Sequence, residues 1–422
     1  PRSIAETACA LWRHVLPAAI LIGSLIGLMR VLFITGEYPP LQGGIADYTA
    51  LLRSELRALD VTSEVLTDAA CASTEPTVHP VVGTWGFPFW GVARQIISER
   101  RIDVVHIQYQ TAAYDLKPAI NLLPWYLQRR SPRPAIVTTF HDLSEPYVFP
   151  KAGPVRRWAT HMLGRHSDAL IFTTQEDREQ WDTAVKATGT SKQGNPTHHI
   201  GLGSAVPVIP ISAEERGALR SECGVAPDAF LIGFFGFVNA TKGLDTLFAA
   251  VRLLRDQDML VQVLIVGGSV GDSDPSNAVY KERLERLIRR LDLDMGDILL
   301  STGYVEAAEA SRALATCDVV ALPFTDGASL RRTSLLTALD HGLPVVTTVP
   351  KQPIPELQES GALLLVPPDD PQALSDALRR LNEDRTLCET LSTAARQFTR
   401  RFSWSRIAEH TLAVYNEASR RK

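Results

Sequence analysis

The stretch of residues 318–348 constrains the fold more than any other part of the chain. Residues 319–322 form a short apolar run, which is typical of a buried parallel strand. A polar loop with a glycine follows at residues 325–329, and the leucines after it are spaced as on one face of a helix. Gly342 ends that helix before another apolar run at residues 345–348. The pattern predicts a strand, loop, helix and strand of an open α/β sheet.

The first turn of this predicted helix carries groups that suit an anion. Ser329, Arg331, Arg332 and Thr333 lie there. Free backbone N–H groups, the positive end of the helix dipole and guanidinium groups can together bind a phosphate or a diphosphate. The alternative is an ordinary exposed helix start with two solvated arginines, and the residues of this stretch alone leave both open.

The same stretch resembles the donor-nucleotide segment of retaining glycosyltransferases of the large family-four group. The resemblance rests on Leu-Pro-Phe at residues 322–324 and on His-Gly-Leu-Pro-Val-Val at residues 341–346. It implies the two-domain GT-B fold and an enzyme that transfers a sugar, expected to be a hexose, from a nucleotide-diphosphate sugar. The family usually has two glutamates here, which contact the donor sugar and the ribose. In this chain their positions are occupied by Ser329 and Thr337, and we expect these two residues to lie at the donor. Both carboxylates are absent from this chain.

Composition limits the class of protein. The chain has 422 residues, enough for two domains, and its 45% hydrophobic and 21% charged residues are typical of a globular protein. A formal net charge of −4 gives no support for a nucleic-acid partner. The five cysteines are scattered, without the paired spacing of a zinc site or a disulfide framework. We therefore expect a cytoplasmic protein, with the inner face of the membrane as the alternative.

Residues 1–28 require separate treatment. The apolar run at residues 15–28 is short for a membrane span and is interrupted by proline and glycine. Basic residues precede it, so a signal peptide or signal anchor is the alternative. Met29 and Arg30, followed by apolar residues, look like the start of a first strand. We expect residues 1–28 to be an extension outside the fold.

The first half of the chain contains a glycine loop after a predicted strand. Residues 31–35 predict the strand, and Gly43-Gly44 would let the backbone approach a ligand before a helix at residues 46–59. The pattern G-x-G-x-x-G is missing, so a nicotinamide dinucleotide is not predicted. The loop resembles the first loop of the same glycosyltransferases, which implies that Gly43 and Gly44 meet the donor phosphates or the acceptor.

A second strand, at residues 135–140, ends in His141 and Asp142. A histidine at this point lies where open α/β sheets bind ligands, and the alternative is a buried histidine satisfied by backbone groups. The matching segment of the family lines the cleft near the transferred sugar, which implies catalytic roles for His141 and Asp142. Arg156 and Arg157 follow and could meet an anionic acceptor, with solvation at the surface as the alternative.

Four aromatic residues gather between residues 78 and 92, among glycines and prolines. We expect most of them to pack as core under a loop. The alternative is a patch that faces the acceptor or a membrane, which would give the protein a peripheral membrane contact.

The second half of the chain opens with a strand at residues 230–235, followed by Gly236 and then Lys242-Gly243 before a helix. A lysine that opens a helix beside a strand-end glycine can bind a diphosphate as a point charge, and the alternative is a surface lysine. These residues match the donor-phosphate loop of the family, which implies that Gly236, Lys242 and Gly243 bind the donor.

The family usually has an arginine directly after the first glycine of this loop, where the present chain has Phe237. A diphosphate clamp would then lose one charged contact. Arg331 or Arg332, on the loop expected to face it, could replace the missing charge.

Two consecutive sets of alternating strands and helices predict two doubly wound, Rossmann-like α/β domains that face a central cleft. Glycines and prolines at residues 201–210 predict the hinge between them. The expected ranges are 29–205 for the acceptor-side domain, 206–396 for the nucleotide-sugar domain and 397–422 for a helix that crosses back to the first domain.

The favoured function is transfer of a sugar to an acceptor hydroxyl with retention, which the family implies, without a cofactor or a metal ion. The acceptor is expected to be a carbohydrate or a lipid-linked molecule in cell-surface polysaccharide or glycolipid synthesis. Two rivals remain. One is a nucleotide-sugar 2-epimerase of GT-B fold, which would need acid–base carboxylates such as Glu37 and Asp142. The other is an inactive binding subunit, which the two missing glutamates favour.

Overall fold

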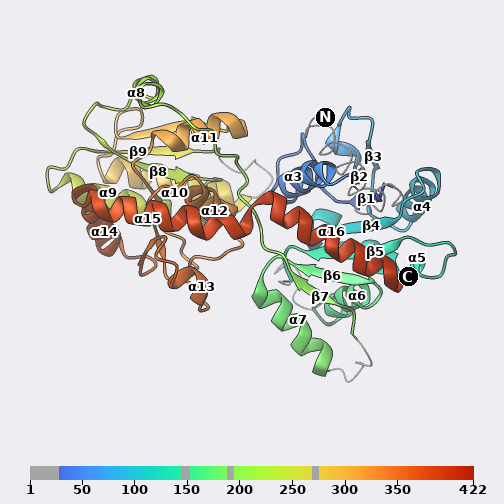
Figure 1. Ribbon diagram of the computed structural model, residues 1–422. Helices are drawn as coiled ribbons and strands as arrows, with labels where there is room; N and C mark the ends of the chain where they lie inside the picture. The colour runs from blue at the N-terminus through green and yellow to red at the C-terminus, as the bar shows by residue number, and fades with distance from the viewer. Residues whose placement is uncertain (1–27, 144–152, 188–193, 269–274) are drawn as a thin grey trace, which may run out of the picture. The chain divides into compact units, whose positions relative to one another are not determined.

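The computed structural model describes residues 28–143, 153–187, 194–268 and 275–422. The chain divides into two compact units, and we describe each by itself (Figure 1). Unit 1 comprises Pro1–Ile200 together with Ala408–Lys422, and unit 2 comprises Gly201–Ile407. The extension predicted at residues 1–28 lies outside the described residues, except for Leu28.

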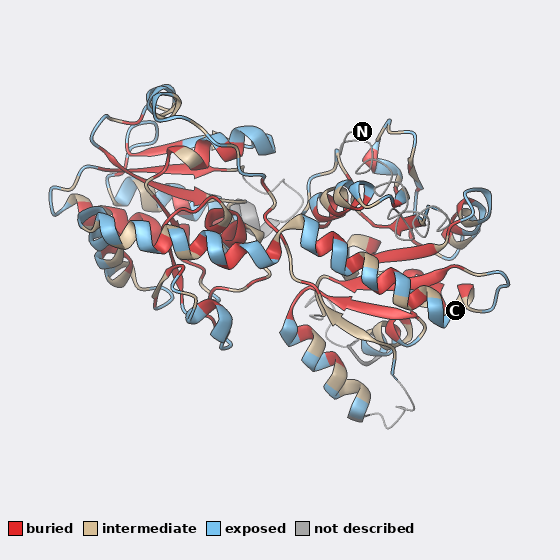
Figure 2. Cartoon of the chain, viewed as in Figure 1, coloured by how far each residue is buried: buried red, intermediate tan, exposed pale blue. Residues whose placement is uncertain are grey.

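Unit 1 is built on a seven-stranded sheet in which every neighbouring pair of strands is parallel. The central strands are buried along nearly their whole length, as expected for a sheet covered on both faces (Figure 2). In sheet order, the strands are β3 (Val78–Val82), β2 (Thr62–Asp68), β1 (Arg30–Ile34), β4 (Val104–Tyr109), β5 (Ala135–Phe140), β6 (Ala169–Phe172) and β7 (Thr197–His199).

Side chains alternate along each strand, so the sheet of unit 1 presents two different faces. Leu32 and Ile34 of β1 point into one apolar cluster, to which four helices contribute. His106 of β4 points to the other face, where it contacts Tyr415 of the C-terminal helix. The four helices of the first face are α4 (Phe89–Glu99), α5 (Ala119–Leu127), α6 (Gly153–Arg165) and α7 (Gln175–Ala187). The helices of the second face are α3 (Gly44–Ala58) and the end of α16 (Trp404–Arg421).

Unit 2 is built on a six-stranded, fully parallel sheet with its own apolar core. In sheet order, the strands are β10 (Leu299–Gly303), β9 (Val261–Val266), β8 (Phe230–Phe235), β11 (Val319–Leu322), β12 (Val345–Thr348) and β13 (Leu364–Val366). The helices are α8 (Ala213–Glu222), α9 (Leu244–Arg255), α10 (Pro275–Arg290), α11 (Ala307–Thr316), α12 (Thr333–Asp340), α13 (Pro355–Gln358), α14 (Pro371–Glu383) and α15 (Arg385–Thr399).

Both sheets reverse their direction of winding at one point. The reversal lies between β1 and β4 in unit 1 and between β8 and β11 in unit 2. Open α/β sheets bind ligands at the carboxyl ends of the strands beside such a reversal. The predicted site residues follow β1, β5, β8 and β11, so they emerge at these carboxyl edges. The prediction of two Rossmann-like α/β domains, with a C-terminal helix that returns to the first, is confirmed.

Two predicted helices differ from the structure. The helix expected to begin near Ser329 begins at Thr333, because the backbone of Arg332 is extended, with φ −91° and ψ 95°. The sequence of residues 114–128 also predicts one helix, but the structure has only α5 there, because Asp115 and Leu116 adopt positive φ values of 53° and 57° that a helix cannot continue through.

The four aromatic residues between positions 78 and 92 differ in how far they are buried. Trp85 and Phe89 are buried in unit 1, at 1% and 2% exposure, and Trp85 packs edge to face with Tyr114. Phe87 is 54% exposed. Within the described ranges, no helix is both long and apolar enough to cross a membrane.

Candidate functional site

The loop after β8 closely approaches the end of β11 through a glycine. Gly236 has φ +118°, and its N–H donates to the carbonyl of Val266 over 3.0 Å. Gly243 has φ +68°, and a Cβ there would lie only 1.9 Å from the carbonyl oxygen of Pro323. Position 243 therefore excludes any side chain, and the 3-10 turn η4 (Ala240–Lys242) is held directly against the neighbouring strand end.

Lys242 reaches from this loop to the segment after β11. Its Nζ donates a hydrogen bond to the hydroxyl of Ser334 over 3.1 Å and lies 5.2 Å from the ring centroid of Phe324. Desolvation lowers the pKa of Lys242 to about 8; the charge of Arg332 also lowers this pKa, and Asp326 raises it. A nearby anion would restore the stability of the ammonium form.

Arg332 lies beside Lys242 over the same aromatic ring. Its Cζ is 4.2 Å from the ring centroid of Phe324, and its guanidinium forms an ion pair with Asp326. Burial lowers the pKa of Arg332, and Asp326 raises it. Nε of Arg332 is buried and has no hydrogen-bond partner among the described residues. An unsatisfied guanidinium N–H beside a lysine is the arrangement expected where a phosphate oxygen binds.

The helix that follows, α12, starts without a side-chain cap among the described residues. Its first N–H groups, beginning at Thr333, have no intrahelical carbonyl to bind, so they can bind an anion. Ser329 lies before the helix in a turn, where its hydroxyl accepts the backbone N–H of Arg331 over 3.2 Å. The structure thus brings Lys242, Arg332 and Thr333 together at the reversal between β8 and β11.

Thr337 lies elsewhere, in the interior of unit 2. It is 0% exposed, and its hydroxyl oxygen lies 3.1 Å from both the hydroxyl of Ser204 and the backbone N–H of Ala205. The same segment is held by Trp404, whose Nε1 donates to the carbonyl of Ser204 over 2.7 Å. This geometry favours a structural role for Thr337 over the predicted contact with the ribose, because its side chain already binds the segment that opens unit 2.

The two glycines after β1 have different surroundings. A Cβ on Gly43 would lie 2.0 Å from a carboxylate oxygen of Glu37, so the backbone there packs against that side chain. A Cβ on Gly44 would meet nothing within 4 Å, so this glycine borders open space. Desolvation raises the pKa of Glu37, and the charge of Asp47 adds to the rise.

His141 follows β5, and its ring is held on two sides. Nε2 lies 2.7 Å from Oε1 of Gln108, and the ring of Tyr48 meets it edge to face at 4.7 Å between centroids. The backbone N–H of His141 donates to the carbonyl of Tyr109 over 3.0 Å. Desolvation lowers the pKa of His141 to about 4, so the ring is neutral at neutral pH. The contact of Gln108 with His141 was not predicted from the sequence, although Gln108 lies near the carboxyl end of a buried strand, where site residues are expected.

A cavity of about 290 Å³ lies next to Asp142 in unit 1. Two guanidinium groups and three hydroxyl groups line it against a single carboxylate, which suits a polar ligand with negative charge. The sequence indicated Arg156, Arg157 and Asp142, but the rest come from separate elements that no local pattern connects. The lining residues are Tyr109, Thr111, Asp142, Leu143, Arg156, Arg157, Thr160, His161, Gln180, Trp181 and Ala184.

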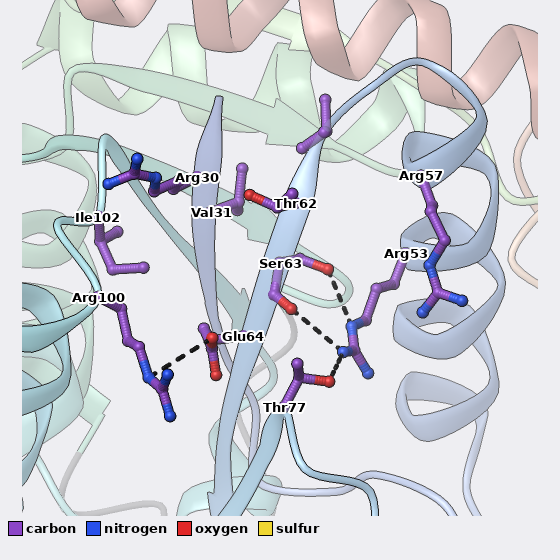
Figure 3. A pocket seen from close by; sticks show the side chains of 11 residues that line it. Arg30, Val31, Arg53, Arg57, Thr62, Ser63, Glu64, Thr77, Arg100 and Ile102 are labelled. Carbon is purple, nitrogen blue, oxygen red and sulfur yellow. Dashed lines mark hydrogen bonds and ion pairs between the residues drawn. The ribbon is translucent and has the colours of Figure 1, made fainter. Parts of the chain in front are cut away.

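A second cavity of unit 1, of about 410 Å³, lies at the opposite edge of the sheet (Figure 3). Arg30 and Thr62, at the amino ends of β1 and β2, line it. Arg53 in its wall is already bonded to Ser63 and Thr77, as Figure 3 shows. None of the site residues predicted from the sequence lines this cavity.

Within the described residues, no group of three or more His, Cys, Asp or Glu side chains could hold a metal ion. Asp-x-Asp pairs occur in the sequence at residues 256–258, 272–274 and 292–294. Residues 272–274 lie outside the described residues. Asp256 and Asp258 lie between α9 and β9, and Asp292 and Asp294 lie between α10 and β10, so both pairs precede the amino ends of their strands and not the carboxyl ends that carry the candidate site.

Comparisons with known proteins agree with this arrangement. Residues 229–384 match the family model described as Glycosyl transferases group 1, and residues 43–183 match the one described as Glycosyl transferase 4-like domain. The D-inositol 3-phosphate glycosyltransferase of Streptomyces bingchenggensis is 26% identical over 403 residues, which cover 90% of this chain and 85% of that protein.

Solved structures share the fold. Sucrose-phosphate synthase from Thermosynechococcus elongatus matches with a TM-score of 0.67 and 20% identity, over 92% of this chain and 98% of that one. Anabaena HepE in complex with UDP-glucose matches with a TM-score of 0.68 and 19% identity, over 92% and 99%. The chain thus belongs to the glycosyltransferases of the group 1, family-four type, and it has the GT-B fold.

Proposed function

We propose that this glycosyltransferase moves a sugar from a nucleotide-diphosphate sugar to an acceptor hydroxyl, with retention of configuration and without a metal ion. The observation that carries the proposal is the convergence of Lys242 and Arg332 over Phe324 at the uncapped start of α12. Two cations this close together, one with a buried and unsatisfied N–H, favour a ligand with at least two negative charges.

A diphosphate leaving group is the ligand that best suits these residues. Negative charge grows on the diphosphate as its bond to the sugar breaks, and fixed cations and backbone N–H groups stabilise that charge most in the transition state. Lys242 and Arg332 would therefore accelerate the reaction as well as bind the donor. The complex of HepE with UDP-glucose supports UDP-sugars as the first donors to test.

Arg332 also supplies a positive charge that is missing at Phe237, where the family usually has an arginine. Phe237 is 36% exposed and brings no charge to the loop after β8. Arg332 brings a guanidinium from the segment after β11 to the same lysine. We infer that the clamp keeps two cations although one has changed its place in the sequence.

The acceptor is proposed to bind in unit 1, in the cavity beside Asp142. Its two arginines and three hydroxyls suit a sugar or lipid-linked sugar that carries an anionic group. The name of the relatives, D-inositol 3-phosphate glycosyltransferase, indicates an acceptor of that kind for those proteins. We propose that His141 and Asp142 contact the acceptor or the transferred sugar at this edge, and that the product belongs to a cell-surface polysaccharide or glycolipid.

One observation favours a different function. Ser329 and Thr337 stand where the family has glutamates, so an inactive binding subunit would keep the diphosphate clamp and lose the contacts to the sugar. Such a protein would bind nucleotide diphosphates with the same residues. Binding alone therefore does not distinguish the two functions.

The test is incubation with a panel of UDP-, GDP- and ADP-sugars, with anionic and neutral sugar acceptors, in the presence of a chelator. Release of nucleoside diphosphate is followed, and NMR reads the anomeric configuration of the product. We expect an acceptor-dependent release that Lys242→Ala abolishes, with an α-configured product from an α-configured donor. Binding without any turnover would support the inactive subunit, and an epimerised nucleotide sugar would support the epimerase.

A further inference from the structure

A chain of buried polar side chains runs through unit 1 behind His141. Oε1 of Gln108 lies 2.7 Å from Nε2 of His141, and Nε2 of the same amide lies 3.3 Å from Nε2 of His106. His106 also contacts the hydroxyls of Thr139, at 2.7 Å from Nε2, and of Tyr415, at 2.6 Å from Nδ1. His106, Gln108 and Tyr415 are each 0% exposed. These linked polar contacts therefore connect α16 to the edge of the sheet that carries His141.

The hydrogen-bond roles along this chain follow from the chemistry of the groups. An amide oxygen only accepts hydrogen bonds, so the nitrogen of His141 that faces Gln108 must carry the ring hydrogen. The amide N–H₂ of Gln108 and the hydroxyl of Thr139 can both donate to Nε2 of His106. Nδ1–H of His106 then donates to the hydroxyl of Tyr415. With this orientation of the Gln108 amide, each contact pairs one donor with one acceptor.

The second nitrogen of His141 has a different environment. Nδ1 has no hydrogen-bond partner in the part of the chain that the structure describes, and His141 is only partly buried. Nδ1 is not one of the buried polar atoms that lack a partner in the described residues. This nitrogen is therefore accessible at the surface. A neutral ring with hydrogen on Nε2 presents a lone pair at Nδ1.

We propose that Gln108 is a positioning residue for His141: its side-chain oxygen holds the Nε2–H form of the ring, so that Nδ1 accepts a hydrogen bond from a hydroxyl of the substrate. The inference rests on the proposed function, because it takes His141 to meet a sugar or an acceptor. It deepens that function by giving His141 the role of an acceptor. A carboxylate in place of the amide would charge the ring and reverse that role.

Three variants separate this role from ordinary packing. Gln108→Glu keeps the size of the side chain and places a negative charge against Nε2, which stabilises the imidazolium. Gln108→Met keeps the length and removes the hydrogen bond. Tyr415→Phe is the matched control, because it removes a buried hydroxyl from the same chain and leaves the contact between Gln108 and His141. Thermal unfolding of each variant shows that it is folded.

The direct readout is NMR of protein labelled with ¹⁵N-histidine, which needs no substrate. The His141 signals are assigned by their loss in His141→Gln. We expect Nε2 of His141 to carry the hydrogen in the wild type and in Tyr415→Phe. Tyr48 from α3 and Gln108 from β4 contact the ring, His106 lies close enough to interact electrostatically with it, and Asp142 is the next residue in the sequence. Only Gln108→Glu adds a charge to them, so it should raise the pH at which His141 protonates.

Activity gives the second readout. In Gln108→Met we expect kcat to fall about tenfold to a hundredfold with little change in KM for the donor, the scale found for groups that orient an active-site ligand. In Gln108→Glu, activity should also fall as the pH decreases through the raised pKa of His141. Hydrogen on Nδ1 in the wild type, or wild-type titration of His141 in Gln108→Glu, would overturn the inference. If transfer is never detected, the NMR result still decides the tautomer, and only the proposed function fails.

Discussion

Lys242 donates a hydrogen bond of 3.1 Å to the hydroxyl of Ser334, although the two residues are 92 positions apart in the chain. The contact joins the loop after β8 to the first turn of α12, which follows β11. These are the two strands between which the winding of the sheet reverses. A ligand that binds Lys242 therefore lies at the start of α12 as well, and both features act on the same negative charge.

Replacement of this lysine should weaken donor binding. We expect Lys242→Ala to reduce the affinity for nucleoside diphosphates by about 1.5–3 kcal/mol, the scale of a hydrogen bond to a charged group. Isothermal titration calorimetry with UDP, GDP and ADP measures the change. The control is Lys281→Ala, which removes an exposed lysine from α10 of the same unit. Equal affinities for the wild type and Lys242→Ala would show that the diphosphate binds elsewhere.

The affinity should also depend on alkaline pH. The pKa of Lys242 is lowered to about 8, so the free protein loses this ammonium charge as the pH rises through about 8. A bound diphosphate favours the charged form, so binding is tightest below that pH and weakens above it, by up to about tenfold per pH unit. Calorimetry between pH 7 and pH 10 measures the slope. The slope should be absent in Lys242→Ala, and a flat wild-type curve would contradict the assignment.

The two neighbouring arginines should differ in importance. Arg332 stacks on Phe324 beside Lys242, and its planar guanidinium can bind two phosphate oxygens at once, which a lysine cannot. We expect Arg332→Lys to lose most of the transfer activity, because the lysine keeps the charge but not the geometry. Arg331→Lys is the matched control and should retain nearly full activity. If both variants are active, Lys242 and the backbone of α12 hold the phosphates without either guanidinium.

Thr337 should matter for stability and little for the nucleotide. Thr337→Val removes the acceptor for the backbone N–H of Ala205 inside unit 2, so we expect the free energy of unfolding to fall by about 1–3 kcal/mol. Chemical denaturation measures the loss, and Thr337→Ser should restore most of the stability. Calorimetry with the nucleotide should show unchanged affinity. A folded Thr337→Val protein with much weaker nucleotide binding would instead support the contact with the ribose.

The sequence by itself determined the class of fold and the loops that carry the site. Apolar runs such as residues 319–322, each followed by a loop and a helical pattern, depend on the local alternation of buried and exposed positions. That alternation is readable without knowledge of distant neighbours. The sequence likewise predicted that Gly236, Lys242 and Gly243 lie between a strand end and a helix start, because these features are adjacent in the chain.

Only the tertiary structure decided which side chains of these loops lie close together. The extended backbone of Arg332 places the helix start at Thr333. The guanidinium of Arg332 then stacks on Phe324, the same ring that Lys242 approaches. The burial of Thr337 depends on Ser204, which no local pattern connects with it. Such contacts follow from packing, which the spacing of residues in one segment does not describe.

The polar chain behind His141 shows the same limit most clearly. His106 and Tyr415 are 309 positions apart, and they meet only because the end of α16 packs on the sheet of unit 1. The sequence indicated that His141 ends a strand at the ligand edge. It could not indicate that Gln108 holds one ring nitrogen, because the orientation of two side chains on neighbouring strands depends on the register between β4 and β5. The local hydrophobic pattern therefore determined where the candidate site lies, and long-range packing decided how its side chains are oriented.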